Sequence, residues 1–310
     1  MGMDAIRFVY EHLRRLSQRP ETISLFLHSN GGEGTVPWKL VTLIREYCDR
    51  FRVVVPYRAF SAATLTALGA DEIYMHPMGM LGPTDPSITG PYNPRDAEGN
   101  PLPISVEEVL AYLDLVKEDA GIQHEDELVL AVNKLAENVH PVALGSVKRT
   151  HSQSRMIATK LMALAEPRLD EHKIEEIVSN LTSKLYYHGH PINRKEAREL
   201  GLSVMECSPE VETAIWELYE QYEEDMELLS PFRAADLFIK AAPNLPANSG
   251  KLIDVPKIYL VIVESRLGCH ALVAENQIFG TKDANGAVQT QVYTNRLEWE
   301  TCEQEAKRRG

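Results

Sequence analysis

The stretch YRAFSAATLTALGADEIYMHPMGMLGPTDP, residues 57–86, decides how this chain is interpreted. Ser61 follows FRVVVPY, an apolar run typical of a buried strand, and precedes AATLTALGA, a run of small residues typical of a closely packed helix. α/β enzymes often present a nucleophile at such a strand-to-helix corner. Ser61 is therefore the candidate nucleophile. The alternative is a helix N-cap, a position that serine favours, and the two roles are compatible.

About thirty residues upstream, SLFLHSNGGEG (residues 24–34) is a second strand-like run that ends in a Gly-Gly turn. Glycines allow a turn to aim backbone N–H groups at a developing oxyanion. The pair Gly31-Gly32 and the start of the helix at Ala62 are the candidate donors, and an ordinary strand-to-helix turn is the alternative. A glycine turn and a serine corner, each after a buried strand, indicate acyl-transfer chemistry.

The surrounding residues predict a parallel sheet with helical crossovers. Helical patterns alternate with short apolar runs, and such alternation is typical of right-handed β-α-β units. The expected helices are 4–18, 36–50 and 62–70, and the expected strands are 23–28, 53–57 and 72–75. Residues 83–103, which hold six prolines, are expected to form a long exposed loop.

The second half of the chain is predicted to be helical, with a small β-rich end. A capping-box pattern, Ser105 with Glu108, opens the first of these helices. Residues 241–257 are expected to be a linker, followed by an antiparallel β appendage. We expect two domains, 1–230 and 231–310. The further expected helices are 125–138, 141–165, 170–182, 193–200 and 208–229, with a short strand at 185–187.

Composition excludes several classes of protein. The chain has 310 residues, is 44% hydrophobic and carries a net charge of −13, so a nucleic-acid partner is not expected. Its four cysteines show no CxxC spacing, which is typical of a reduced, cytoplasmic chain without a zinc site. No cofactor is expected, and the pair His188 and His190 lacks a third metal ligand. No apolar run is long enough to span a bilayer, so membrane association is expected only through a partner.

Four segments carry a resemblance to a known family: SLFLHSNGGEG, AFSAATLTALGADEIYMHPMGMLGPTDP, HPVALGSVKRTHSQSRMIATKLM and YYHGHPINRKEARELGL. They resemble the Clp-protease/crotonase superfamily, and within it the serine dehydrogenase proteinase and signal peptide peptidase A group. The resemblance covers residues 4–205. The superfamily normally places a strand before the helix with which this chain begins, so we expect that strand to be missing or supplied otherwise.

The resemblance implies an α/β fold: a crotonase-like (Clp-type) ββα spiral with a helical second half and a small C-terminal β-rich appendage. It implies a serine peptidase, ATP-independent or partner-assisted, that cleaves a peptide or protein substrate through an acyl-enzyme. Ser61 falls on the nucleophile, and the N–H groups of Gly32 and Ala62 fall on the oxyanion donors, with Gly31 shaping the turn. Members usually work as homo-oligomers, which we expect here.

The general base is the open part of this assignment. Clp-type members carry a histidine on the strand after the nucleophile helix, where this chain has Thr84 and Asp85. Peptidases of the signal-peptide type use a lysine, which can act as a base if desolvation lowers its pKa. Asp71 and Asp85 are interpreted as turn residues and His76 as a structural residue at a strand end. The candidates for the base are Lys148 and His188, with Lys117, Lys134 and His76 after them.

Two alternatives stay open. A crotonase-type enzyme that processes acyl-CoA would use the oxyanion donors without needing Ser61, but Arg58 is the one evident basic residue near the turn. A non-catalytic scaffold or partner-binding protein would keep the fold and have lost the base.

Overall fold

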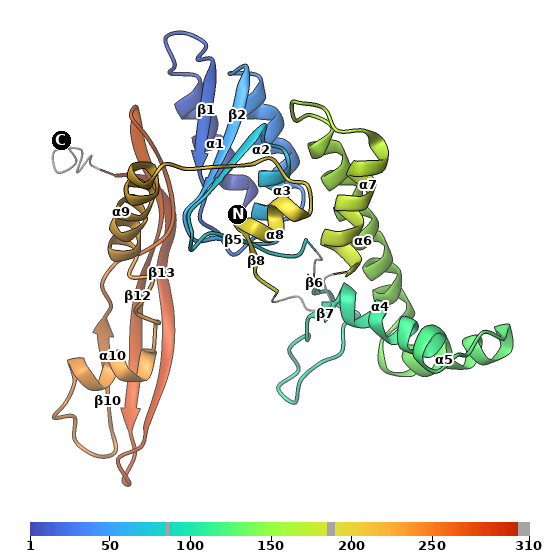
Figure 1. The fold of residues 1–310 in the computed structure, drawn as a ribbon. Helices are drawn as coiled ribbons and strands as arrows, with labels where there is room; N and C mark the ends of the chain where they lie inside the picture. Colours follow the sequence, from blue (N-terminus) through green and yellow to red (C-terminus); the bar gives the residue numbers. More distant parts are fainter. Residues whose placement is uncertain (85–86, 185–189, 303–310) are drawn as a thin grey trace. The chain divides into compact units, whose positions relative to one another are not determined.

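The structure, a computed structural model, describes residues 1–84, 87–184 and 190–302 (Figure 1). The chain divides into two compact units. The first comprises Met1–Ile6 and Gln18–Ile215, and the second comprises Arg7–Ser17 and Trp216–Gly310. Each unit has its own sheet and its own buried apolar side chains. Helix α1 (Met3–Leu13) contributes residues to both units.

Four parallel strands form the central sheet of the first unit: β1 (Thr22–Phe26), β2 (Arg50–Val55), β4 (Glu72–Met75) and β9 (Val204–Met205), in that order. Helix α2 (Val36–Arg45) joins β1 to β2, and α3 (Ala62–Leu68) precedes β4. In β2 and β4, Val53, Val55, Ile73 and Met75 are buried, as expected for strands covered by helices. The predicted parallel β-α-β arrangement is therefore confirmed.

A small second sheet lies beside the corner that carries Ser61. Its strands are β3 (Arg58–Ala59), β5 (Met80–Leu81) and β8 (Ile192–Asn193); β3 is parallel to β5, and β5 is antiparallel to β8. An isolated parallel bridge joins Ser29 to Ala59. This bridge ties the turn after β1 to the corner before α3, so two segments thirty residues apart are held together.

Residues 83–103 lead into the helical part of the first unit. The loop expected over residues 83–103 contains strand β6 (Ser87–Ile88), which pairs antiparallel with β7 (Ile104–Ser105) just after the loop. Thr84 and Asn93 are buried, so the expectation of an exposed loop was wrong at these positions. Ile104 is buried there against Val147 and its neighbours. The helices are α4 (Val106–Asp114), η1 (Leu115–Asp119), α5 (Glu125–Asn138), α6 (Pro141–Met162), α7 (Glu171–Ser179), η2 (Asn180–Lys184) and α8 (Arg194–Glu199).

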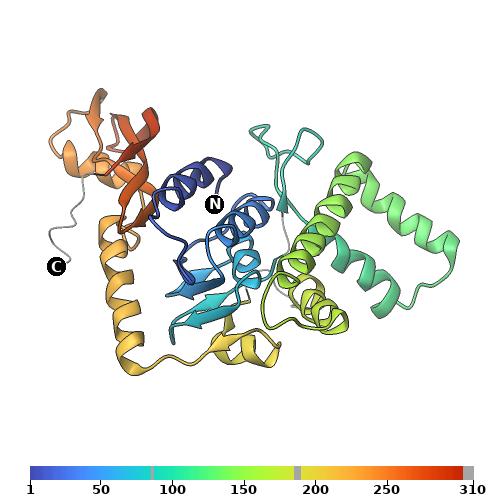
Figure 2. The ribbon, with the colours of Figure 1, turned by 90° about the horizontal axis from the view of Figure 1, so that it is seen from above.

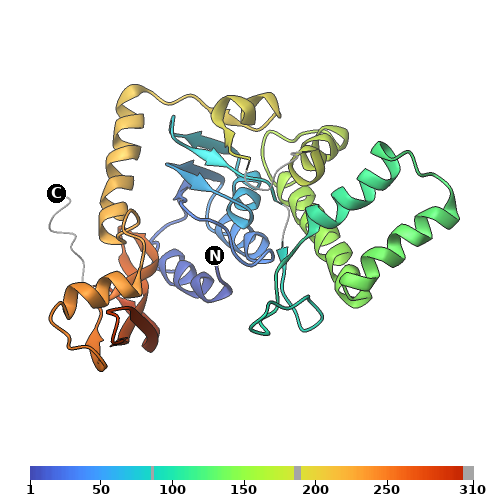
Figure 3. The ribbon, with the colours of Figure 1, turned by 90° about the horizontal axis from the view of Figure 1, so that it is seen from below.

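Helix α6 is the part of this region that bears on the site. It packs on α3 and α2, and Figure 2 shows the sheet, then α2 and α3, then α6. One half of the predicted capping box at the start of α4 is present, since Ser105 Oγ accepts the Glu108 N–H at 3.4 Å. Helix α5, at the outer end of these helices (Figure 3), has no buried residue.

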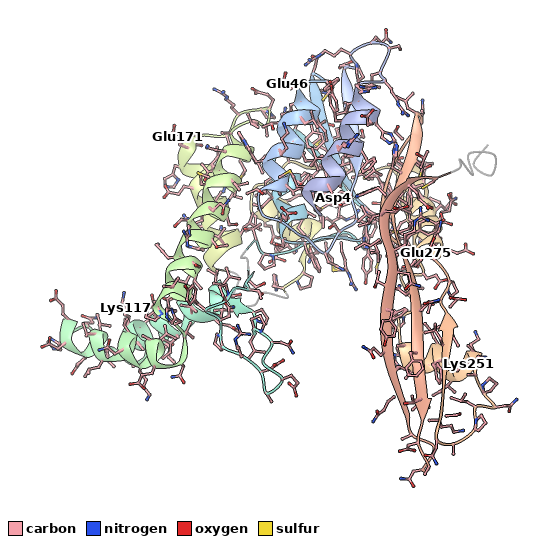
Figure 4. The ribbon with its side chains drawn as sticks, turned by 180° about the vertical axis from the view of Figure 1, so that it is seen from behind. Asp4, Glu46, Lys117, Glu171, Lys251 and Glu275 are labelled. Carbon is pink, nitrogen blue, oxygen red and sulfur yellow. The ribbon has the colours of Figure 1, made fainter. Side chains whose placement is uncertain are left out.

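The second unit is built on an antiparallel sheet, as predicted. Strand β12 (Gly268–Lys282) pairs with β13 (Val288–Thr301) on one side and with β10 (Ser249–Asp254) and β11 (Ile258–Ser265) on the other; Figure 4 labels Glu275 on β12 and Lys251 on β10. Helix α10 (Ala234–Ala241) and strand β10 were not predicted. Phe238 of α10 is buried against Ile253 and Ile278, so tertiary packing orders this proline-rich stretch. Helix α9 (Pro209–Asp225) precedes them.

Two predictions remain, one on membrane-spanning helices and one on a short strand. No helix among residues 1–84, 87–184 and 190–302 is both long and apolar enough to cross a membrane. The strand predicted at 185–187 lies outside the described residues.

Candidate active site

Ser61 lies at the corner between β3 and α3 in a backbone conformation that is rare for a residue with a side chain. Its φ is 53° and its ψ is −114°. Such a conformation costs about 1–3 kcal/mol and persists only where the surrounding structure imposes it. The Ser61 side chain makes no capping bond to α3, although the residue occupies the N-cap position. The hydroxyl is therefore not used for the capping role that was the alternative interpretation.

Thr64 holds the corner in place from inside the protein. Its buried hydroxyl Oγ1 lies 2.7 Å from the Ala59 carbonyl and 2.9 Å from the Gly82 carbonyl, and it accepts the Gly82 N–H at 3.1 Å. A Cβ placed on Gly82 would lie 2.9 Å from the Phe60 ring. The segment after β5 is thus packed directly against the residue before Ser61, so the corner cannot relax without moving its neighbours.

The Gly-Gly turn lies directly against Ser61. A Cβ on Gly31, whose φ is +112°, would lie 2.9 Å from the Ser61 Cβ and 3.4 Å from its Oγ. The Gly31 N–H donates to Ser29 Oγ at 3.0 Å. Among the described residues, the N–H groups of Gly32 and Ala62 have no protein acceptor, so they remain available to a ligand. The structure thus brings together Gly31, Ser61 and Ala62, while the oxyanion role of Gly32 and Ala62 stays a prediction.

The main chain of Met1 lies along the other side of this turn. Its amino group donates to the Gly31 carbonyl, and its carbonyl accepts the Glu33 N–H at 3.0 Å. Burial lowers the pKa of this amino group. A Cβ on Gly32 would lie 2.0 Å from the Met1 carbonyl oxygen. Only glycine fits there, because a Cβ would overlap the Met1 main chain and because the φ of this residue is +149°.

His28 links the Gly-Gly turn to the serine corner, a role that the sequence did not indicate. Its Nδ1 accepts the Arg58 N–H at 3.3 Å, and its ring stacks on Tyr57 with 6.0 Å between centroids. The guanidinium of Arg58 lies over the ring of Tyr57, 4.6 Å from its centroid. Burial, and then the charge of Arg58, lower the pKa of His28 to about 4. The imidazole of His28 is therefore neutral at neutral pH.

We expect this histidine to make stability depend on pH. Its pKa is about 6.5 when exposed and about 4 in the fold, so its contribution is present above pH 6.5 and is lost as the pH falls towards 4. A shift of this size corresponds to about 3.4 kcal/mol, which solvent screening at this half-buried side chain reduces to about 2–3 kcal/mol. Urea unfolding of wild type and His28→Gln between pH 7 and pH 4 measures it. The wild type should lose more stability than the variant across this window; parallel curves would contradict the assignment.

The predicted bases lie in different places. Lys148 is exposed on α6, so it lacks the desolvation that would make a lysine a base. Lys117 is also exposed (Figure 4), and Lys134 is exposed and paired with Glu137. His76 accepts the Met78 N–H at 3.1 Å at the end of β4, which agrees with a structural role. The remaining candidate, His188, lies outside the described residues, and so does Asp85, which was predicted to be a turn residue.

His151 is a titratable residue that the sequence analysis did not single out. It is half-buried on α6, one turn before Ser154, whose buried hydroxyl donates to the Thr84 carbonyl at 2.7 Å. It shares the stripe of Ala143 and Val147, both buried. The helical spacing of these positions was visible in the sequence and would have separated His151 from the exposed Lys148.

Metal binding finds no support among the described residues, where no group of three or more His, Cys, Asp or Glu side chains could hold an ion. His190 Nε2 lies 2.8 Å from Glu196 Oε1 instead.

The segment of the chain that builds this site is similar to a known protein family. Residues 6–95 match the model of the ClpP-like SDH-type serine proteinase family. The matched segment contains β1, the Gly-Gly turn, the serine corner, α3 and β4. The predicted resemblance to the serine dehydrogenase proteinase group is therefore confirmed.

Similar proteins span more than this segment. Two uncharacterized proteins of Methanocaldococcus jannaschii are related in sequence: MJ0137 is 29% identical over 207 residues, and MJ1495 is 25% identical over 218 residues. The alignments cover 67% and 70% of this chain, but 62% and 63% of the relatives. The chain thus spans less than two thirds of the length of either relative.

Among solved structures, a mutant of a membrane-bound stomatin-specific protease in complex with a substrate peptide is 15% identical, with a TM-score of 0.24 over 70% of this chain and 89% of that chain. This TM-score is too low to establish a common fold.

Proposed function

We propose that this chain is a serine peptidase with a crotonase-like fold that cleaves peptide bonds through an acyl-enzyme on Ser61. The observation that carries the proposal is the Ser61 backbone, held at φ 53° with its side chain against Gly31 and without a capping bond. A strained serine whose hydroxyl does no structural work is typical of a nucleophile. The family match over residues 6–95 supports the same chemistry.

The proposed reaction has two halves. In the first, the Ser61 hydroxyl gives its proton to a base while Oγ bonds to the scissile carbonyl carbon. The Gly32 and Ala62 N–H groups stabilise the resulting oxyanion. The C–N bond then breaks, and the amine leaves with the proton from the base. In the second half, the same base takes a proton from water as the water oxygen bonds to the acyl carbon. The bond from that carbon to Oγ then breaks, which releases a carboxylic acid, and the proton returns to Ser61 Oγ.

We infer that His151 is the base to test first. A base has to be shielded from bulk water and close to the nucleophile. His151 lies on the inner side of α6 together with Ser154, whose hydroxyl donates a hydrogen bond to the Thr84 carbonyl. Thr84 follows Gly82, which packs against the residue before Ser61. Lys148 lies on the same helix but is exposed. It therefore serves as a matched control for His151.

Fluorophosphonate labelling with site mapping by mass spectrometry tests the proposal. We expect the peptide that contains Ser61 to be labelled in wild type and unlabelled in Ser61→Ala, because the probe reacts only with an activated hydroxyl. His151→Ala should slow labelling of Ser61 by about 100-fold or more, and Lys148→Ala should leave it unchanged. Labelling with the fluorophosphonate is measured between about pH 6 and 9, because a lysine or histidine with a perturbed pKa titrates in this range.

Two results would contradict the peptidase. A folded protein in which Ser61 stays unlabelled across this pH range would favour the scaffold. Turnover of a thioester that survives Ser61→Ala would favour an acyl-CoA enzyme, which needs the oxyanion donors and not the serine.

A further inference from the structure

Three side chains of the second unit form a continuous series of hydrogen bonds. Ser265 lies at the end of β11, His12 on α1 and His270 on β12. His12 Nδ1 lies 2.5 Å from Ser265 Oγ, and His12 Nε2 lies 3.0 Å from His270 Nδ1. This is the order nucleophile, base and orienting group that activates hydroxyls in enzymes.

The backbone around Ser265 holds its hydroxyl oxygen beside His12. The Leu267 N–H donates to Ser265 Oγ at 3.1 Å and occupies one of its two lone pairs. Two sets of tautomers satisfy the hydrogen bonds among the three side chains. In the set that activates the serine, its O–H donates to His12 Nδ1, and the neutral His12 carries its proton on Nε2 and donates it to His270 Nδ1.

The serine of this group is exposed to solvent, and the two histidines are buried, as a reactive serine with a shielded base requires. Ser265 is exposed, while His12 and His270 are only 6% and 8% exposed. Phe8 shields the histidines: its ring centroid lies 4.9 Å from that of His270 and 4.4 Å from that of Trp299. The nucleophile can therefore meet a substrate from solvent, while the base lies in surroundings of low polarity.

Charged groups around the two histidines favour their neutral forms. Burial lowers the pKa of both His12 and His270, and the positive charge of Arg15 lowers them further. Glu264 acts in the opposite direction on His12, and Glu11 does so on His270. Since desolvation is the largest cause for both, His12 is unprotonated and able to accept a proton at neutral pH.

We propose that Ser265 is a second nucleophile of this chain, with His12 as its general base and His270 as the positioning residue, and that it accepts acyl groups from small activated esters. The site is independent of Ser61, since its three side chains all belong to the second unit. An exposed serine on a tight turn suits small acyl donors, because the turn offers no walls to hold a long peptide.

The proposed step transfers one proton and exchanges one bond. The Ser265 O–H proton moves to His12 Nδ1 as Oγ bonds to the ester carbonyl carbon. The bond from that carbon to the leaving oxygen then breaks, and the alcohol takes the proton from His12. Arg15 is placed to stabilise the oxyanion: its Nη1 lies 3.5 Å from the Leu267 carbonyl and would lie 3.5 Å from a Cβ on Gly268.

The test uses the full chain carrying Ser61→Ala, so that a failure of the first site cannot hide the second. We expect a fluorophosphonate to label the peptide containing Ser265, and p-nitrophenyl acetate to give a burst of one equivalent of p-nitrophenol. Adding Ser265→Ala should abolish both signals. Ser249→Ala is the matched control, because its hydroxyl bonds to the Pro246 carbonyl and to no histidine, and it should change neither.

Variants of the histidines separate base from positioning residue. His12→Gln should slow labelling of Ser265 by about 100-fold or more. His270→Gln should shift the midpoint of the pH profile of labelling, which a merely structural role would not do. Absence of label on Ser265 in the folded Ser61→Ala protein would overturn the proposal without any histidine variant. So would labelling that is unchanged by His12→Gln, and the hydrogen bonds would then serve only to fasten α1 to the sheet.

Discussion

Replacing Ser61 with glycine is expected to abolish covalent labelling at this position and at the same time to stabilise the protein. Ser61 has a φ of 53°, which glycine adopts without the penalty that a Cβ imposes. Relief of about 1–3 kcal/mol of strain, less the larger entropy that glycine loses on folding, leaves a gain of about 1 kcal/mol. Ser61→Ala retains the Cβ and should lose labelling without gaining stability. The protein would thus trade stability for a reactive hydroxyl.

Urea unfolding of wild type, Ser61→Gly and Ser61→Ala measures this difference. Ser105 provides the matched control, since it is also a serine at a helix N-cap but has a φ of −72° and accepts the Glu108 N–H. At Ser105 the wild type should be the most stable of the three residues, with a loss of about 1 kcal/mol in the alanine variant. If glycine also destabilised the protein at position 61, the strain argument for the nucleophile would fail.

Asp71→Ala is expected to have the largest effect on stability. Asp71 is 4% exposed, and its carboxylate accepts the N–H groups of Phe51 and Glu166, each at 2.7 Å. It also pairs with Arg45 at 2.7 Å. Its removal leaves the buried Phe51 N–H and the partly buried Glu166 N–H without their acceptor, and the largely buried Arg45 guanidinium without its counter-charge, which costs about 3–5 kcal/mol. Asp71 thus joins α2, β2 and the segment that follows α6, which is more than the turn role predicted for it.

The same measurement on an exposed pair is the control. Asp49 accepts Arg19 Nε at 3.0 Å, but both side chains are more than half exposed, so Asp49→Ala should cost no more than about 1 kcal/mol. Asp71→Asn, which keeps an acceptor oxygen, should fall between Asp49→Ala and Asp71→Ala. Equal midpoints in urea for the Asp71→Ala and Asp49→Ala variants would contradict the importance of this buried carboxylate.

Local pattern was enough to predict the sheet of the first unit. Its strands are short apolar runs between helices of clear periodicity, and residues 72–75 and 125–138 were predicted with the bounds that the structure has. The second unit was less predictable. Strand β10 and helix α10 lie in a stretch rich in proline, and they are ordered because Ile253 and Phe238 bury each other against β12. Such pairing between distant residues leaves no periodic signal in either segment.

For the candidate site, the sequence by itself determined the parts: a serine after a strand, a small-residue helix, and two glycines thirty residues earlier. These follow from local rules, because glycine, serine and apolar runs have conformational preferences of their own. The tertiary structure decided their use. It places Gly31 against Ser61, leaves the Ser61 hydroxyl uncapped, and distinguishes the half-buried His151 from the exposed Lys148. It also joins His12 to Ser265 across 253 positions of the chain. Burial and contact between distant residues arise only when the chain folds, so no local pattern encodes them.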